Sequence, residues 1–278
     1  MQGQGVVTPN ISAQCGQDPL PCGDKYMFPG GVAHGSGWVS PIQLDGDTKY
    51  AFFSFAGEGV SVEGSVSVLS DTLWVMVEGN WYIFGGLDDA SVAWPTARAG
   101  FASWFNDSPD NAGTYIFGGW STSSRTSTTQ CSLADLWYLD ASQASFDTPS
   151  QNGTAVTAQL LSPSMVNGVC DFVGSIDPLW PHARSEPSIW KSTLNGHTLL
   201  WMAFGRRPGP GTFVHTQAAY NDMWFYNVSS SQWTQVMTND PTDTKRPPIR
   251  SSASLWKLND DSVGVCVCVC VCVCVCVR

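Results

Sequence analysis

The sequence of 278 residues has 13 lysines and arginines against 23 aspartates and glutamates, which gives a formal net charge of −10. A chain this acidic is a poor match for nucleic acid or an anionic membrane surface, so we expect neither as a partner. No apolar run is long enough to cross a bilayer, and no window of helical length repeats its apolar residues every 3.6 positions. We therefore expect an all-β protein with no membrane insertion by this segment.

Residues 1–28 form an N-terminal segment with two cysteines, Cys15 and Cys22, around a Gly-Gln-Asp-Pro-Leu-Pro loop. The first residues lack the basic start and apolar core of a signal peptide. Two interpretations stay open: the N-terminus is truncated and the protein is extracellular, or the protein is cytoplasmic with free thiols.

From residue 29 onward, one spaced pattern occurs four times. Each copy opens with Pro and has a Trp nine residues later, and three of the four add an Arg three residues after the Pro. The pairs are Pro29/Trp38, Pro95/Trp104, Pro181/Trp190 and Pro247/Trp256, and the arginines are Arg98, Arg184 and Arg250. The copies start 66, 86 and 66 residues apart, which indicates a repeat architecture.

The segments within each copy follow one order. An apolar run ends in a glycine turn, a polar loop follows, an acidic residue then precedes a Trp, and an aromatic residue closes the copy. These segments are short, aromatic and β-branched, and Gly, Pro, Asn, Asp and Ser separate them, which predicts strands joined by turns. Asn195-Gly196 predicts a type I′ hairpin turn.

This order resembles the kelch motif of β-propellers. The resemblance rests on Phe-Gly-Gly at 117–119, Asp-Leu-Trp at 135–137, Asn-Asp-Met-Trp at 221–224 and Trp233, and it covers residues 29–261. It implies a partial propeller with three four-stranded blades (29–94, 95–180 and 181–246) and the truncated start of a fourth (247–261). In the first copy, Val32 replaces the Arg and Ala56-Gly57 replaces the Gly pair, and in the third copy we assign Arg206 to the position of the second glycine.

In kelch blades, residues at the motif positions are structural, and we expect this role for Pro95, Arg98, Trp104, Gly118, Gly119, Asp135, Trp137, Pro181, Arg184, Trp190, Gly205, Asp222, Trp224 and Trp233.

Residues 262–278 form a low-complexity tail in which Val and Cys alternate from Val265 to Val277. A GT dinucleotide repeat read in one frame encodes this alternation, and introns commonly begin with GT. We interpret the tail as a gene-model artefact, a read-through of a splice donor. The other interpretation is a metal-binding or redox tract, but the run lacks the turns that a four-thiolate zinc site needs between its cysteines.

Four cysteines lie outside the tail, and an even number in loops is compatible with two disulfides. Three pairings are possible, and we favour the local ones, Cys15–Cys22 and Cys131–Cys170. Four Asn-x-Ser/Thr sequons predict N-glycosylation of an extracellular chain, at Asn10, Asn106, Asn152 and Asn227.

No pattern predicts catalytic, cofactor-binding or metal-binding residues. The histidines, His34, His182, His197 and His215, have no metal-site spacing, and neither a Gly-x-Ser-x-Gly elbow nor a phosphate-binding loop occurs. We therefore expect no cofactor and no enzymatic activity. An enzyme resembling galactose oxidase, which holds one copper with Tyr and His ligands, is the alternative, with Tyr138, Tyr220 and Tyr226 as the tyrosines to consider.

The resemblance implies a binding module that presents inter-strand loops to a protein or a glycan. The long loops at 58–70, 120–133, 147–180 and 206–219 are rich in Ser, Thr, Gly and Asn, which suits adaptable polar contacts. Arg206-Arg207 forms the one local basic patch and is a candidate recognition loop for an acidic partner.

Overall fold

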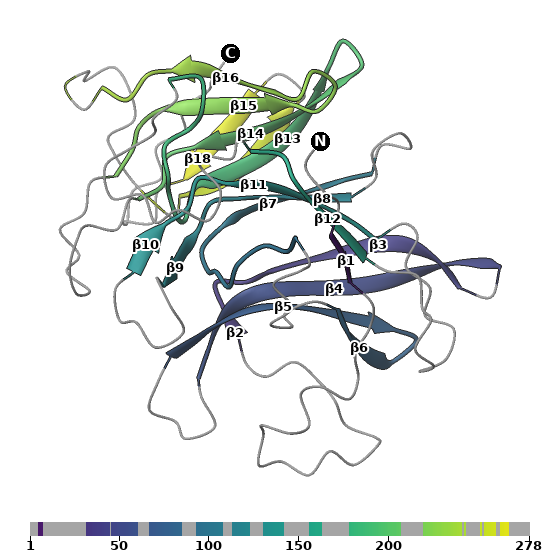
Figure 1. Ribbon diagram of the computed structural model, residues 1–278. Helices are drawn as coiled ribbons and strands as arrows, with labels where there is room; N and C mark the ends of the chain where they lie inside the picture. Colours follow the sequence, from purple (N-terminus) through teal and green to yellow (C-terminus); the bar gives the residue numbers. More distant parts are fainter. Residues whose placement is uncertain are drawn as a thin grey trace.

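A computed structural model describes residues 5–7, 32–44, 46–60, 67–84, 93–107, 113–122, 130–141, 156–162, 178–206, 219–240, 242, 251, 253–259 and 262–266. Every regular element among these residues is a β-strand, all pairings are antiparallel, and none of the sheets closes on itself (Figure 1). The expected all-β class is therefore confirmed for the described part of the chain. In that part, no helix has the length and hydropathy needed to span a membrane.

Three antiparallel sheets follow one another along the chain. In the first, β3 (Ser36–Leu44), β4 (Asp47–Val60), β5 (Ser67–Val77) and β6 (Asn80–Phe84) pair in sequence order, and β2 (Val32–Ala33) pairs with the end of β4. In the second, β7 (Ala102–Asn106), β8 (Gly113–Phe117), β11 (Leu136–Asp140) and β12 (Val156–Leu160) do the same. The third contains β13 (Ser188–Leu194), β14 (His197–Ala203), β15 (Met223–Asn227) and β16 (Gln232–Met237).

Two further pairs and one added strand complete the fold. In the connection between β8 and β11, β9 (Trp120–Thr122) pairs with β10 (Gln130–Ser132). After the third sheet, β17 (Ser254–Asn259) pairs with β18 (Ser262–Cys266). Each interval of the sequence repeat thus contains one sheet or, in the last, a hairpin. The expected boundary at 261 falls inside that hairpin. In addition, β1 (Gly5–Val7) joins the free edge of β12, a pairing that the sequence did not predict.

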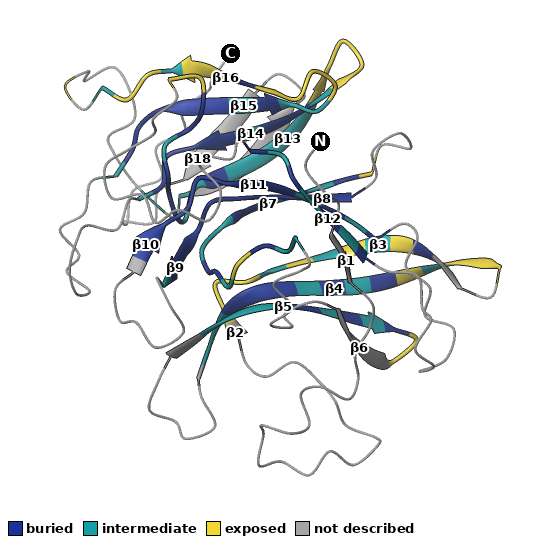
Figure 2. Cartoon of the chain, in the orientation of Figure 1, coloured by how far each residue is buried: buried dark blue, intermediate teal, exposed yellow. Residues whose placement is uncertain are grey.

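Successive sheets stack face to face, and apolar side chains fill the space between them (Figures 1 and 2). Phe53 and Leu73 of the first sheet pack with Ile116 and Trp137 of the second. On its other face, the second sheet packs against the third through a set of buried side chains that includes Trp104, Tyr115, Phe117, Leu200, Met202, Trp224, Tyr226 and Trp233. Seven of the 13 buried residues in this second set are aromatic, which explains the aromatic content of the repeat.

The Trp that follows each repeat's Pro by nine residues faces the next sheet. Trp38 packs against the core between the first and second sheets, and Trp104 lies between the second and third. Trp190 and Ala253, which is next to the start of β17, both pack against the cluster of Ala203, Phe204 and Met223. One side of each sheet is therefore a Trp-bearing side, and it points toward the sheet that follows in the sequence.

Two consecutive residues with positive φ lie within β4 and directly after β8 and β14. The pairs are Ala56-Gly57, Gly118-Gly119 and Phe204-Gly205, with φ of 54° and 112°, 66° and 94°, and 64° and 101°. The second residue is glycine each time, because a Cβ there would lie within about 3 Å of a carbonyl oxygen, that of Ala33, Ala99 or Ser185.

This geometry corrects our alignment of the third copy. Arg206 does not replace the second glycine, because Gly205 occupies that position and Phe204 occupies the first. The register supports this assignment, since Arg206 bridges Ser185 in the third sheet as Trp120 bridges Ala99 in the second. The first position holds Ala56 in the first sheet and Phe204 in the third, and glycine is common to all three sheets only at the second position. The sequence pattern of one glycine therefore left the register ambiguous.

The Asn195-Gly196 hairpin between β13 and β14 is confirmed. Leu194 pairs with His197, which leaves two residues in the turn, and their φ values are 50° and 79°. Positive φ at both central positions is what a type I′ turn requires.

Replacing Gly119 with Ala should destabilise the chain by about 2 kcal/mol more than replacing Gly196 with Ala. Both changes put Ala in a left-handed conformation, at a cost of roughly 1–2 kcal/mol. Only at Gly119 does the new Cβ meet a backbone oxygen, 2.8 Å away, which adds about 1–3 kcal/mol, whereas nothing lies within 4 Å at Gly196. Urea unfolding of both variants measures the difference, and equal losses would contradict the packing argument.

Candidate functional site

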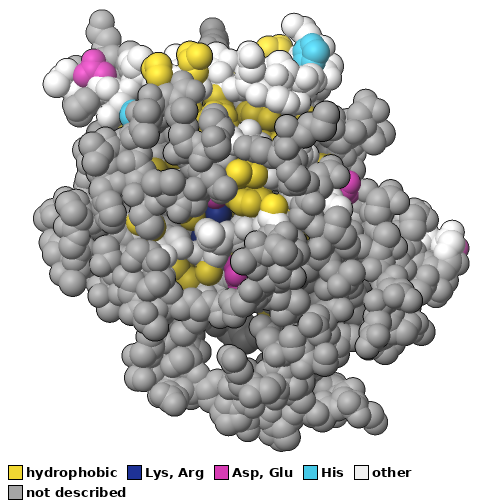
Figure 3. Space-filling view, in the orientation of Figure 1, with side chains coloured by type: hydrophobic (Ala, Val, Ile, Leu, Met, Phe, Trp, Pro, Cys, Tyr) yellow, Lys and Arg dark blue, Asp and Glu magenta, His cyan; other side chains and the backbone are white. Residues whose placement is uncertain are grey.

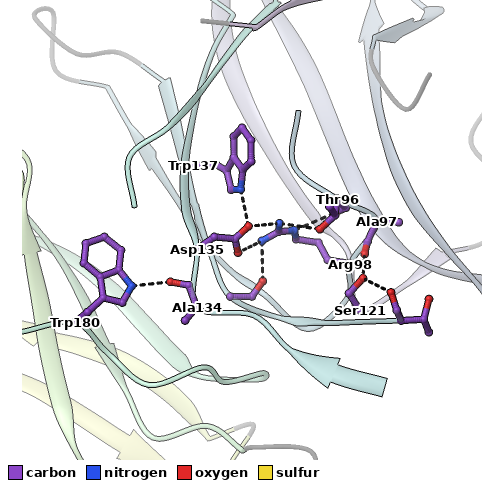
Figure 4. Close-up of polar contacts among 10 residues, drawn as sticks. Thr96, Ala97, Arg98, Ser121, Ala134, Asp135, Trp137 and Trp180 are labelled. Atoms are coloured by element: carbon purple, nitrogen blue, oxygen red, sulfur yellow. Dashed lines mark hydrogen bonds and ion pairs between the residues drawn. The ribbon is translucent and has the colours of Figure 1, made fainter. Parts of the chain in front are cut away.

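A buried ion pair joins the segment before β7 to the segment before β11 (Figure 4). Arg98 binds Asp135 in a bidentate arrangement, with Nη1–Oδ1 at 2.8 Å and Nη2–Oδ2 at 2.7 Å, and both side chains are 0% exposed. Its other N–H groups donate to the carbonyl oxygens of Gly118 and Thr96 and to Thr96 Oγ1. All five guanidinium donors therefore have acceptors, which offsets the cost of burying the charge.

Asp135 has a further donor, because Trp137 Nε1 donates to its Oδ2 at 2.7 Å. Two neighbouring side chains bind the backbone beside this network. Ser121 Oγ donates to the Ala97 carbonyl, and Trp180 Nε1 donates to the Ala134 carbonyl, each at 2.7 Å (Figure 4). The network thus connects the lead-in to β7, the glycine turn and the start of β11.

The third sheet repeats five of these hydrogen bonds between equivalent atoms. Arg184 binds Asp222 at 2.6 and 2.7 Å, and its Nη1 donates to the Phe204 carbonyl, the counterpart of Gly118. Trp224 Nε1 donates to Asp222 Oδ2 at 2.9 Å. The guanidinium also lies over the Tyr220 ring, 4.4 Å from its centre, which adds a cation–π contact.

The same arginines connect each sheet to the one before it through their backbone. The Arg98 amide donates to the Ser70 carbonyl of the first sheet, and Gly57 of that sheet donates to the Arg98 carbonyl. Arg184 repeats this arrangement with Leu133 and Gly119 of the second sheet. In each case the side chain binds within its own sheet while the main chain binds the preceding sheet.

A chain of backbone hydrogen bonds runs beside these networks, and sequence reasoning missed it. His34, Gly100 and Glu186 each lie five residues after the repeat's Pro, and their φ values are 57°, 62° and 52°. The Gly100 amide donates to the His34 carbonyl at 2.8 Å, and the Glu186 amide donates to the Gly100 carbonyl at 2.6 Å. The constant offset from the Pro was the one sequence signal that could have identified these positions.

Charged side chains gather around these three residues. Glu186 forms a partly buried ion pair with Arg206, and His34 Nδ1 lies 3.8 Å from Glu58 Oε2. We call His34, Glu58, Gly100, Glu186 and Arg206 the lead-in rim. The long connections at 58–70, 120–133 and 206–219 all begin beside it, directly after the residue pairs with positive φ. In the space-filling view, basic and acidic atoms show between hydrophobic ones near the middle of the described surface (Figure 3).

The candidate recognition loop is only partly described. Arg206 exchanges backbone hydrogen bonds with Ser185 and pairs with Glu186, so its charge is already neutralised within the protein. Arg207 lies outside the described residues. Of the two arginines in the expected basic patch, the structure describes Arg206, and its side chain pairs with Glu186 of the lead-in rim.

The expected cysteines and glycosylation sites are placed unevenly. Cys131 is buried in β10 opposite Ser121, while Cys15, Cys22 and Cys170 lie outside the described residues, so both disulfides stay predictions. Asn227 accepts hydrogen bonds from Ser229 and Ser230 in an exposed turn, which is compatible with a glycan. Asn10 and Asn152 lie outside the described residues.

Burial argues against glycosylation of Asn106. Its side chain is 1% exposed at the end of β7, where a glycan has no room in the folded chain. The sequon gave no sign of this, because burial of this asparagine depends on tertiary packing.

Two of the three tyrosines considered for copper lie together. Tyr138 and Tyr226 flank Tyr115, with ring centres 4.9 and 6.0 Å from it. Burial raises the pKa of Tyr138 to about 12 and also raises the pKa of Tyr226, so both are protonated at neutral pH. Tyr220 lies elsewhere, stacked on His182. Within the described residues, no three His, Cys, Asp or Glu side chains form a group able to hold a metal ion.

No protein-family model matches the sequence, and no curated protein matches it.

The buried ion pair predicts a large difference between two aspartates. Asp135→Asn should lower the free energy of unfolding by about 3–5 kcal/mol, because it leaves Arg98 buried without its counter-charge. Asp107, which binds Lys191 Nζ at a similar 2.6 Å but is 74% exposed, is the matched control, and Asp107→Asn should cost about 1 kcal/mol or less. Urea unfolding measures both. A loss of less than about 1 kcal/mol at Asp135 would contradict a structural role for the pair.

Proposed function

We propose that the chain is a partial kelch-type β-propeller in which the three sheets are blades and the β17–β18 hairpin begins a fourth. The recurrence of one polar network at Arg98–Asp135 and Arg184–Asp222 carries this proposal, because unrelated sheets would not repeat five donor–acceptor pairs. Contacts between the first strands of successive intervals support it as well, since β7 contacts β13 and β13 contacts β17. Strands that start each repeat and lie side by side are expected around a common axis.

We further propose that this framework is an interaction module for a protein or glycan partner. Glycine turns fix one end of all three sheets, and the polar networks support the same end of the second and third sheets. Long connections leave from that end. A rigid scaffold that carries variable loops is the usual arrangement for recognition. The polar composition of these loops suits adaptable hydrogen bonding, and the net charge of −10 disfavours nucleic acid.

The proposed setting is extracellular, as part of a larger protein, and the cytoplasm is the alternative. Asn227 in its exposed turn and the four cysteines outside the tail are the features that favour secretion. The alternative activity, that of a galactose-oxidase-like fragment, would need a tyrosine that shares a site with histidines. Tyr220 stacks on His182, and Tyr138 and Tyr226 pack against other aromatic rings, so no observation favours this alternative.

Loop replacement tests the interaction module. The chain is screened against a defined glycan array and a panel of purified extracellular domains, and each binder is measured again after residues 123–129 or 207–218 are replaced by Asn-Gly. We expect one replacement or both to abolish saturable binding while the melting temperature stays the same, because the loops recognise and the sheets support.

The matched control replaces the Val228–Ser231 turn, which joins β15 to β16 at the opposite end of the third sheet, with Asn-Gly. This change should leave binding intact. Binding that survives both loop replacements but is lost with the control would contradict the proposal. Absence of any binder, together with copper-dependent peroxide release on sugars, would favour the oxidase instead.

A further inference from the structure

One strand of the second sheet receives an additional strand from a distant part of the chain. β1 pairs antiparallel with the outer edge of β12, with Gly5 opposite Ala158 and Val7 opposite Val156 (Figure 1). The other four strands of this sheet come from residues 102–160, whereas β1 precedes the first sheet in the sequence. The outer edge of β12 therefore accepts a strand that is not its neighbour along the chain.

The sequence and burial of β12 are those of an inner strand. Val156, Ala158 and Leu160 are buried, and the two residues between them are partly exposed. Natural edge strands are often protected from further pairing by charged side chains, proline or bulges, and β12, which the structure describes in full, has none of the three. In β16, the outermost strand of the third sheet, four of six residues are exposed and the register shifts. β12 thus suits pairing on both of its edges.

β1 fills this edge only in part. It pairs with Val156, Thr157 and Ala158, which are three of the five residues of β12. One of its own three residues is glycine, which weakens a strand. Three residues form few ladder hydrogen bonds, and each gives a modest net stabilisation because water competes for the same groups. We therefore expect β1 to be a weakly held strand that a longer one can replace.

We propose that the outer edge of β12 is a strand-addition site, at which an extended segment of a partner protein replaces β1 and pairs antiparallel with β12. In this mode of recognition, main-chain hydrogen bonds supply the affinity and alternate side chains supply the specificity. The Gly-Val-Val sequence of β1 indicates the chemistry of the partner segment, which is uncharged and β-branched and pairs with all five residues of β12. This inference goes beyond the proposed function, because the site is the backbone edge of the second sheet and not the connecting loops.

Fluorescence anisotropy of a labelled peptide with the full chain tests this site. The probe, Lys-Val-Gln-Val-Val-Val-Lys, follows residues 3–7 with Val in place of both glycines, and its terminal lysines keep it soluble. The control probe, Lys-Val-Gln-Pro-Pro-Val-Lys, lacks two consecutive N–H groups. Since the N–H groups of successive strand residues point to opposite edges, one of the missing groups must face β12. We expect saturable binding of the first probe and roughly tenfold or more weaker binding of the second.

Substitutions in β1 should change the affinity of the first probe in opposite directions. The double change Val6→Pro and Val7→Pro removes a donor from the ladder and frees the edge, so the dissociation constant should fall roughly threefold or more. Gly5→Val strengthens β1 and should raise the dissociation constant by a similar factor. Both variants keep the sequence of the other four strands, and circular dichroism checks that the sheets stay folded.

Hydrogen exchange locates the bound probe, which should protect amides of β12 and leave those of β16 unchanged. Three results would overturn the inference: no saturable binding even when β1 carries both prolines, equal binding of the two probes, or protection that does not include β12. Replacement of residues 123–129 or 207–218 should leave binding of the probe unchanged. Failure of the strand-addition site and failure of loop recognition therefore appear in separate measurements.

Discussion

The arrangement of this protein depends on an arginine that binds in two directions. The side chain of Arg98 or Arg184 neutralises an aspartate within its own sheet, and its main chain pairs with the sheet before. A buried guanidinium without its carboxylate is costly, so the lead-in segment, the glycine turn and the third strand must be in place together. Because one residue meets both requirements, the orientation of each sheet fixes where the preceding one can lie.

Stacking of this kind brings two different faces together at each interface. The Trp-bearing side of the first sheet meets the plain apolar side of the second, and the Trp-bearing side of the second meets the plain apolar side of the third. The same constraint that orders the sheets therefore gives both interfaces the same two components.

The sequence predicted the framework better than its details. Spacing and resemblance identified the members of both polar networks, including Trp137 and Trp224, because repetition preserves residue type where a buried charge must be paired. The register at Phe204 was wrong, since the first position of the pair holds a side chain in the first and third sheets, Ala56 and Phe204, and only the second position is glycine in all three. The pairing of β1 with β12 and the burial of Asn106 depend on tertiary contacts between distant segments, which carry no local signal.

An experimental structure of the chain by crystallography or electron cryomicroscopy tests the central claim most directly. The account predicts that one rotation about a common axis superposes the first sheet on the second and the second on the third, with β3, β7, β13 and β17 nearest that axis. It also predicts both buried Arg–Asp pairs in the same geometry. Sheets related by different rotations, or arginines that reach solvent, would contradict it.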